Sequence, residues 1–341
     1  MRILLIGGNG FIGRPVVSTL LQQGHKLAVF HRGTAPVPAG VTDIQGNSQL
    51  SASAEELRRF SPEVVVHFVL SSGSQAEELM NVFRGTAGRV VMLSSMDVYR
   101  AVALTHGLES GPLQPVPLTE ESELRRSLHP YPPAMLQNLR QIFSWVTDDY
   151  DKIPAERAVM NDRDLPGTVL RLPMVYGPGD RLHRFYPIVK RIADGRDHIL
   201  FADTLAQWRS PRGYVENVAA AIVLAATDSR AAGKICNVCE EPAFSELEWA
   251  RKIAEEMRWK GDFVLLPAER TPVHLLRPGN TEQHWSASSA RIRRELGYRE
   301  PVAIKQAIRK TIEWELENPP APPFAPVFDY AAEDAALALR N

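Results

Sequence analysis

Three glycines near the start of the chain have the spacing that a phosphate-binding turn requires. Gly7, Gly10 and Gly13 follow an apolar run at residues 3–6, and an amphipathic segment at residues 11–23 begins within this pattern. Glycine lets a strand turn sharply into a helix, and its bare backbone admits a pyrophosphate. The following helix offers unpaired N–H groups and the positive end of its dipole. The pattern predicts a dinucleotide site that includes Gly7, Asn9, Gly10, Phe11, Ile12 and Gly13.

The end of the next predicted strand, residues 26–30, bears on the choice of cofactor. His31 and Arg32 follow it, where such a fold meets the adenosine ribose, and no acidic residue stands there. An acidic residue would accept from the 2′-hydroxyl of NAD, whereas arginine accommodates the 2′-phosphate of NADP. The sequence therefore favours NADP over NAD. The alternative is that Arg32 is only a solvated loop residue.

A pair of hydroxyl side chains follows another predicted strand, residues 89–93. Ser94 and Ser95 would face the same crevice as the glycine turn, because the carboxyl ends of parallel strands meet at one edge of a sheet. A serine hydroxyl there could donate to a substrate oxygen. Alternatively, the two hydroxyls bond the local backbone of a turn.

The elements that must position these residues alternate between strand and helix. Apolar runs predict further strands at 41–45, 63–70 and 168–171, and amphipathic segments predict helices at 54–60, 75–84, 184–193, 290–296 and 304–317. Residues 100–133 predict a long loop over the crevice, a helix is predicted from 148 through 159, and the chain after 318 is expected to be irregular. The alternation predicts an α/β fold with a doubly wound parallel sheet.

Composition and charge exclude several classes of function. The 341 residues include 39 basic and 40 acidic side chains, a net charge of −1, which argues against nucleic acid or an anionic membrane as a partner. No apolar run approaches the ~18 residues that span a membrane. Cys236 and Cys239 fall three apart on a predicted strand and so point to opposite faces, which argues against a metal site. We expect a soluble, cytoplasmic protein without structural disulfides.

Four segments together resemble the extended short-chain dehydrogenase/reductases, in particular the nucleotide-sugar epimerase-like NAD-dependent epimerase/dehydratase family. These segments are residues 7–13, 91–99, 170–179 and 212–218, in the family's order. The resemblance implies a Rossmann-type NAD(P)-binding domain, residues 1–172 with 214–240. It also implies a smaller, mainly C-terminal substrate lobe, residues 173–213 with 241–330, followed by a tail at 331–341.

The resemblance assigns two catalytic residues by motif position. In the family, Ser or Thr holds the substrate oxygen, Tyr transfers a proton as hydride moves, and Lys lowers the pKa of that Tyr and binds the nicotinamide ribose. Ser95 matches the Ser or Thr. Lys152 matches the Lys, because Glu156 follows four residues later.

The tyrosine departs from the family spacing, Tyr-x-x-x-Lys, which places both side chains on one helical face. Asp148 stands four residues before Lys152, and Tyr150 stands only two before it. Three alternatives are open: a late helix start brings Tyr150 beside Lys152, Asp148 takes over proton transfer, or the relay is absent. Pro154 favours the first, because it restricts where the helix begins.

The remaining assignments also follow from the resemblance. Asp97 stands where dehydratases carry an acid for water elimination, unless it only caps a turn. Met174 replaces the usual Asn of sugar-nucleotide enzymes. Arg212 aligns with an arginine that binds the substrate diphosphate, and Arg277 is a candidate second clamp, unless both make surface salt bridges. Further expected cofactor contacts are Asn47, Leu70, Lys152 and Pro173.

The function that the resemblance implies is NAD(P)-dependent hydride transfer, of the epimerase or dehydratase type, on a nucleotide-sugar-like substrate. One alternative is an NADP-dependent carbonyl reductase of the same fold. Another, suggested by the displaced tyrosine, is a non-catalytic dinucleotide-binding member that acts as a binding or regulatory protein. The family also allows a homodimer.

Overall fold

A single parallel sheet organises the N-terminal two thirds of the chain. The computed structural model describes residues 1–33, 36–47, 49–321 and 326–339. Its main sheet has the order β3-β2-β1-β4-β5-β6-β10, with every neighbouring pair parallel. This is the Rossmann-type doubly wound order, which confirms the predicted fold class. The strands are β1 (Arg2–Ile6), β2 (Lys26–His31), β3 (Thr42–Gln45), β4 (Val64–His67), β5 (Arg89–Ser95), β6 (Gly167–Leu172) and β10 (Ile235–Asn237).

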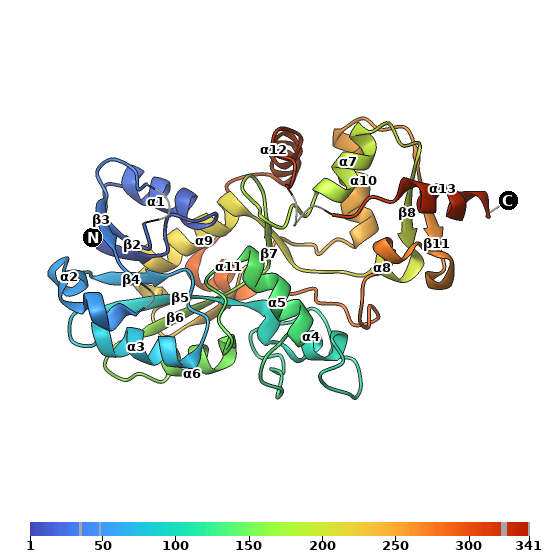
Figure 1. The fold of residues 1–341 in the computed structure, drawn as a ribbon. Helices are drawn as coiled ribbons and strands as arrows, with labels where there is room; N and C mark the ends of the chain where they lie inside the picture. Colours follow the sequence, from blue (N-terminus) through green and yellow to red (C-terminus); the bar gives the residue numbers. More distant parts are fainter. Residues whose placement is uncertain (34–35, 48, 322–325, 340–341) are drawn as a thin grey trace.

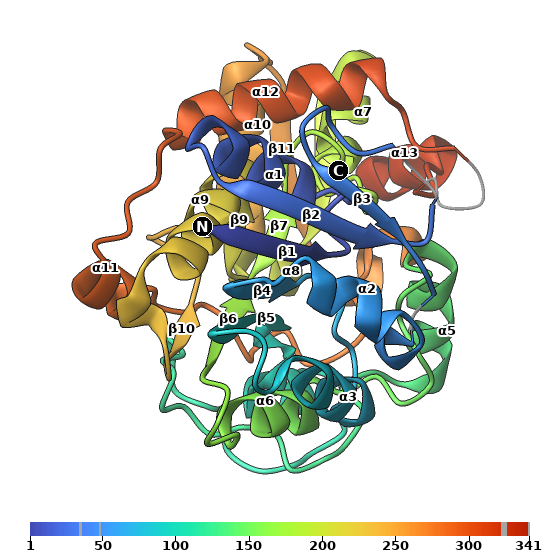
Figure 2. The same cartoon turned by 90° about the vertical axis from the view of Figure 1, so that its left-hand side faces the viewer.

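Helices cover both faces of this sheet (Figure 2). The strand residues alternate between the two hydrophobic cores. α1 (Gly13–Gln22) and α9 (Val215–Thr227) pack on one face, where Ile3 and Leu5 of β1 point. α3 (Gly73–Phe83) and α6 (Lys152–Met160) pack on the other, where Leu4 and Ile6 point. Strands buried on both sides explain why residues 3–6 read as one apolar run.

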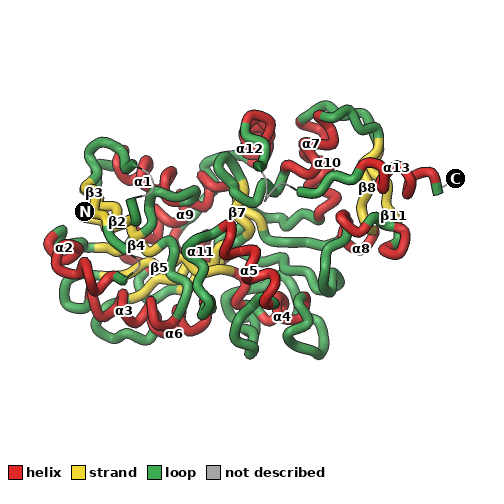
Figure 3. Tube along the Cα trace, viewed as in Figure 1, coloured by secondary structure: helices red, strands yellow, loops and turns green. Residues whose placement is uncertain are grey.

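The C-terminal part forms a separate group of small elements at the end of the molecule opposite the N-terminus (Figures 1 and 3). Two short parallel pairs occur there and at the junction with the main sheet, β8–β11 and β7–β9. These are β7 (Met174–Tyr176), β8 (His198–Ala202), β9 (Arg212–Tyr214) and β11 (Asp262–Leu266). The other helices are α2 (Ala54–Arg59), α4 (Arg100–Thr105), α5 (Pro133–Ile142), α7 (Tyr186–Ala193), α8 (Asp203–Gln207), α10 (Glu246–Glu256), α11 (Ala290–Leu296), α12 (Ile304–Glu317) and α13 (Tyr330–Ala338).

The helix that carries Lys152 begins after residue 148, which agrees with the late helix start that Pro154 favours. α6 starts at Lys152 rather than at Asp148, because Asp151 is its N-cap and accepts a hydrogen bond from the backbone N–H of Ile153. Pro154 lies in the first turn, where its missing N–H costs no helical hydrogen bond. Tyr150 therefore precedes the helix in irregular backbone.

Two other predictions about secondary structure are wrong. Residues 100–133 do not form loop throughout, because the apolar side chains of Ala101–Leu104 are buried and form α4. The segment after the proline cluster is not irregular throughout, because α13 forms and its Glu333 is buried against Arg191. The predicted bounds of α11 and α12 are confirmed.

Two features bear on the protein's surroundings. No helix within the described ranges is long and apolar enough to cross a membrane. Cys236 and Cys239 are both free and buried, and burial raises the pKa of the Cys236 thiol to about 12.

Candidate active site

A cavity of about 1030 Å³ lies at the carboxyl ends of the central strands. This is where doubly wound sheets bind their ligands. It extends from the glycine turn after β1 to the first residue of α6. The predicted residues that line it are Gly7, Asn9, Gly10, Phe11, Ile12, Gly13, His31, Arg32, Asn47, Ser95, Tyr150, Lys152 and Pro173.

The three glycines of the turn are needed for different reasons. Gly7 has a φ of +79°, which other residues rarely adopt. A Cβ on Gly13 would lie 2.3 Å from the carbonyl oxygen of Gly8, so the helix could not approach the turn. A Cβ on Gly10 would meet only the Gly7 oxygen, at 3.7 Å. Gly10 therefore leaves open the space that a pyrophosphate would fill.

Arg32 lines the predicted ribose end of the cavity. Arg32 hydrogen-bonds Ser144, its Nη2 lying 2.6 Å from the hydroxyl, and no ion pair of Arg32 occurs in the described chain. His31 is engaged differently, with its Nε2 2.8 Å from Asp43 Oδ1 and its Nδ1 accepting from the Gly33 N–H. The fit to a dinucleotide is good, because backbone N–H groups, open space and a cation occur in one cavity.

Lys152 is held at the other end of the cavity. Its Nζ donates to the carbonyl oxygens of Leu70 and Leu93, the latter at 3.3 Å, where β4 and β5 end. The same Nζ lies 5.2 Å from the ring centroid of Trp145 and 5.6 Å from that of Tyr150. Lys152 is 3% exposed, and burial lowers its pKa to about 8. Leu70, which the sequence predicts to contact the cofactor, is buried outside the cavity lining, and its carbonyl oxygen accepts from Lys152.

The hydroxyl of Tyr150 points to a carboxylate rather than to the lysine. It donates to Asp97 Oδ2 at 2.8 Å, and Tyr131 donates to the same oxygen at 3.0 Å. Burial and the charge of Asp97 raise the pKa of both tyrosines well above the usual value. The other oxygen of Asp97 is buried without a hydrogen-bond partner in the part of the chain described.

Tyr131 lines the cavity but has no place in the sequence assignment. It lies in the segment before α5, and no spacing connects it with Lys152. In the sequence Tyr131 is followed by the pair Pro132 and Pro133, a pattern that does not by itself indicate a catalytic or binding role.

The two serines at the end of β5 have separate roles. Ser94 donates to Glu156 at 2.5 Å, and Glu156 makes a bidentate ion pair with Arg171. Ser95 lines the cavity, and its hydroxyl accepts from the Asp97 N–H at 3.1 Å, which caps the short 3₁₀ helix η2 (Met96–Val98). The Ser95 hydroxyl proton remains available for a substrate oxygen.

A buried ion pair beneath the site fixes the start of α6. Arg125 binds both carboxylate oxygens of Asp151, at 2.9 and 2.5 Å, and its Nε donates to the backbone oxygen of Asp97. Asp148 lies elsewhere: its side chain is 83% exposed and paired with Arg140. The structure therefore brings Tyr150 to Lys152 but does not bring Asp148 there.

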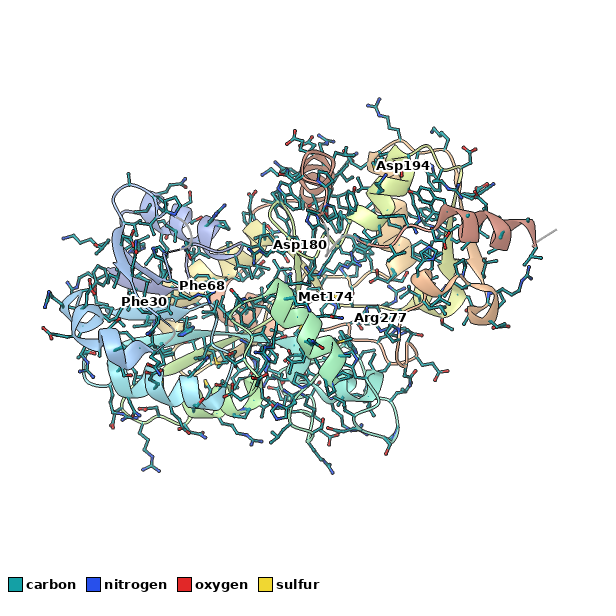
Figure 4. The ribbon with its side chains drawn as sticks, in the orientation of Figure 1. Phe30, Phe68, Met174, Asp180, Asp194 and Arg277 are labelled. Atoms are coloured by element: carbon teal, nitrogen blue, oxygen red, sulfur yellow. The ribbon has the colours of Figure 1, made fainter. Side chains whose placement is uncertain are left out.

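Of the residues predicted to bind substrate, Ser95 lines the cavity, whereas Met174, Arg212 and Arg277 lie outside its lining. Met174 and Arg212 are neighbours across the β7–β9 pair. Arg212 donates to Glu246 at 2.6 Å and lies over the ring of Trp249. Figure 4 shows Met174 and Arg277 in the middle of the molecule, between the main sheet and the C-terminal elements.

Comparison with known proteins agrees with this geometry. A model of the NAD dependent epimerase/dehydratase family matches residues 3–239. A 3-diazoavenalumate denitrifying reductase of Streptomyces sp is 27% identical over 208 residues, 58% of this chain and 63% of that protein. A UDP-glucose 4-epimerase of Yersinia enterocolitica is 28% identical over 170 residues, 44% of this chain and 51% of that protein. Both matches thus span less than two thirds of the curated relative.

A solved structure extends the likeness to nearly the whole chain. The UDP-glucuronic acid 4-epimerase from Bacillus cereus, in complex with UDP-glucuronic acid and NAD, superposes with a TM-score of 0.64 at 16% identity. The superposition covers 93% of this chain and 99% of that one, and at this identity it shows the fold alone. Because the family model matches residues 3–239, most of this chain, the chain belongs to the NAD-dependent epimerase/dehydratase family. An NAD(P) dinucleotide is the typical cofactor of that family.

Proposed function

We propose that the protein catalyses hydride transfer between NAD(P) and a nucleotide-sugar-like substrate, as an oxidoreductase or isomerase of the epimerase/dehydratase type. The observation that carries this proposal is the buried Lys152 ammonium, which lies with Ser95 and Tyr150 in the cavity that begins at the glycine turn. NADP is the proposed cofactor, because Arg32 lines the ribose end without a carboxylate partner among the described residues.

The chain's own residues would divide the work as follows. The bound dinucleotide supplies the hydride acceptor or donor. Ser95 donates a hydrogen bond to the substrate oxygen, and the Lys152 ammonium stabilises negative charge that develops on that oxygen. Tyr150 passes a proton between the substrate oxygen and Asp97, to which it is already hydrogen-bonded.

A carbonyl reductase of the same fold is the second candidate. The pairing of Arg212 with Glu246 favours it, because a neutralised arginine binds a diphosphate less well. The non-catalytic alternative is less favoured. Burying the Lys152 ammonium among carbonyl groups and aromatic rings costs desolvation free energy, and a catalytic role would explain why a charged residue stands there. A homodimer remains a prediction.

The test is turnover that depends on Lys152. Purified protein with NADP⁺ or NAD⁺ is incubated with UDP-glucose and UDP-glucuronic acid, and the products are separated by chromatography. In parallel, NADPH oxidation is followed at 340 nm with a panel of aldehydes and ketones. Lys152→Met should abolish whichever activity occurs, whereas the exposed control Lys260→Met should retain it. The proposal would be refuted if turnover survived in Lys152→Met, or if the wild-type protein turned over none of these compounds.

A further inference from the structure

One oxygen of Asp97 connects two tyrosines of the cavity wall. Tyr150 donates to Asp97 Oδ2 at 2.8 Å, and Tyr131 donates to the same atom at 3.0 Å. Both tyrosines line the cavity that Ser95 and Lys152 also line. Their ring centroids lie 6.0 Å apart. Asp97 Oδ2 therefore forms a bridge between the hydroxyl groups of two residues that line one cavity.

The carboxylate itself lies behind this wall. Asp97 is 6% exposed and, within the described chain, is not one of the residues that line the cavity. Its other oxygen, Oδ1, is buried without a hydrogen-bond partner among the described residues. In that part of the chain, the two tyrosine hydroxyls are the hydrogen-bond donors to this carboxylate. A proton on Asp97 Oδ2 can thus be exchanged with either tyrosine.

Positive charge near Asp97 compensates its burial without occupying its oxygens. Arg125 donates from its Nε to the backbone oxygen of Asp97 at 3.0 Å and pairs with Asp151 through its other nitrogens. The charges of Arg125 and Lys152 both interact with that of Asp97. A buried carboxylate requires such compensation. Because these cations act from a distance, they leave Oδ2 to the two hydroxyls.

Lys152 does not offer the Tyr150 hydroxyl a second route for its proton. The Lys152 Nζ donates to the carbonyl oxygens of Leu70 and Leu93, and it lies 5.6 Å from the centroid of the Tyr150 ring. No hydrogen bond joins this ammonium to the Tyr150 hydroxyl in the described structure, where that hydroxyl donates to Asp97. A proton that Tyr150 takes from a substrate therefore passes on to the carboxylate.

The two tyrosines differ in their access to solvent. Tyr150 is 5% exposed, whereas Tyr131 is only partly buried. Tyr131 also lies two residues before α5, a helix in which no residue is buried. Tyr131 is therefore the member of the pair that lies nearer to solvent.

We propose that Tyr131 is a proton-relay residue, which carries protons between solvent and Asp97 while Tyr150 exchanges them with the substrate oxygen. This proposal rests on the proposed hydride transfer. It adds a path by which the proton that accompanies each hydride enters or leaves the buried site.

The transfers balance as follows when a carbonyl group is reduced. Its carbon receives hydride from the bound dinucleotide, and its oxygen receives the proton of Tyr150. Asp97 Oδ2 returns a proton to Tyr150 after receiving one from Tyr131, and Tyr131 takes its replacement from solvent. The substrate thus gains one C–H and one O–H bond, and solvent loses one proton. Oxidation of an alcohol runs the same transfers in reverse.

The first experiment follows the hydroxyl hydrogens themselves and needs no substrate. Protein labelled with ¹³C at the Cζ of tyrosine is dissolved in an equal mixture of H₂O and D₂O, where splitting of a Cζ resonance reports slow exchange of its hydroxyl hydrogen. Tyr150→Phe identifies the Tyr150 resonance. Tyr131→Phe keeps the ring in the cavity wall but lacks the hydroxyl, so exchange at Tyr150 should slow at least tenfold.

The matched control is Tyr330→Phe. Tyr330 also donates to a carboxylate, that of Asp194 at 2.6 Å, but neither residue is part of the cavity lining. This variant should leave hydroxyl exchange at Tyr150 unchanged.

The second experiment measures the relay during turnover. NADPH oxidation is followed at 340 nm in H₂O and in D₂O, with the aldehyde or ketone that the wild type reduces fastest. Tyr131→Phe should lower kcat at least tenfold and enlarge the solvent isotope effect, because proton supply becomes rate-limiting. Its affinity for NADPH should stay within twofold of the wild type. A residue that only supports the fold would not change the isotope effect.

The relay would be overturned by unchanged hydroxyl exchange at Tyr150 in Tyr131→Phe, or by an unchanged solvent isotope effect in that variant. The proposed hydride transfer fails separately, if turnover does not depend on Lys152. If no compound is turned over, hydroxyl exchange alone decides whether the proton path exists. Slowed exchange in Tyr131→Phe without Lys152-dependent turnover would support the path and refute the catalysis.

Discussion

Tyr150 donates its hydroxyl hydrogen to Asp97 at 2.8 Å. Lys152 lies over the ring of that tyrosine, not beside its oxygen. In a Tyr-x-x-x-Lys arrangement the ammonium would stabilise tyrosinate. Here a carboxylate faces the hydroxyl, so ionisation of the tyrosine is opposed. In the proposed mechanism Tyr150 therefore exchanges its proton with Asp97 and does not form a tyrosinate beside Lys152.

Replacing the carboxylate should make the tyrosines easier to ionise. In Asp97→Asn, the pKa of Tyr150 and Tyr131 should fall from their raised values, although burial keeps them above the usual value of about 10. Absorbance at 295 nm during alkaline titration measures this. The control is Asp162→Asn, at a carboxylate that pairs with Arg84 away from the cavity. Identical titrations for Asp97→Asn and the wild type would contradict the assignment.

Catalysis should depend on pH through Lys152. Burial lowers the pKa of this ammonium to about 8, so it is protonated below that pH and loses its charge above it. The rate of carbonyl reduction in a single turnover should therefore be constant below pH 8 and fall above it. Lys152→Arg should remove the fall, because a guanidinium stays protonated, even though the rate is lower. A fall that persists in that variant would assign it to another group.

The ion pair beneath the site should contribute strongly to stability. Arg125→Met leaves Asp151 buried without its partner, which should lower the free energy of unfolding by about 3–5 kcal/mol at pH 7 in urea denaturation. The double variant Arg125→Met/Asp151→Asn should recover part of the lost free energy of unfolding, because no charged carboxylate is left buried. An unchanged unfolding free energy in the single variant would mean that the pair is not formed.

The same pair predicts how stability depends on pH. Burial raises the pKa of Asp151, but the hydrogen bonds and charge of Arg125 bring it below the usual value. The stabilisation is therefore present above the unfolded pKa of about 3.9 and is lost as the pH falls through the lower folded value. In Arg125→Met, the backbone N–H groups of Ile153 and His129 still donate to Asp151, but the hydrogen bonds and charge of Arg125 are lost, so Asp151 takes up its proton at a higher pH. The stability difference between the two proteins should narrow as the pH is lowered toward 4.

Arg32 should decide between the two dinucleotides. Arg32→Ala should weaken NADP⁺ binding at least tenfold and change NAD⁺ binding less than twofold, because only NADP⁺ carries the 2′-phosphate. Calorimetry measures both constants. The control is Arg59→Ala, at a side chain that is 74% exposed and paired within its own helix. Equal losses for both dinucleotides would show that Arg32 acts on the fold and not on the phosphate.

The sequence predicts the cofactor end of the site better than the catalytic end. The glycine spacing after an apolar run has local physical causes, so Gly7, Gly10 and Gly13 and the elements around them could be placed in advance. Lys152 could be placed from its motif. By contrast, Tyr131 reaches Asp97 from 34 residues away along the chain, and Arg125 reaches Asp151 from 26 residues away. No local pattern encodes such contacts.

The misplaced helix bounds have similar causes. The start of α6 is set by the Asp151 cap and the Arg125 ion pair, which a helical pattern starting at residue 148 does not reveal. α13 is weakly amphipathic and is held by Glu333, which is buried against Arg191 and His274. Buried charges that are satisfied by distant partners read as surface residues in the sequence.

The most direct test of the account is cofactor binding to Gly10→Val. The added side chain would meet only the Gly7 oxygen within the protein, at 3.7 Å for its Cβ, and would occupy the space assigned to the pyrophosphate. The wild type should bind NADP⁺ or NAD⁺ in a calorimetric titration. Gly10→Val should unfold at the same temperature but lose that binding at least a hundredfold. Equal binding by the two proteins would contradict a dinucleotide site at the glycine turn, and with it the proposed hydride transfer.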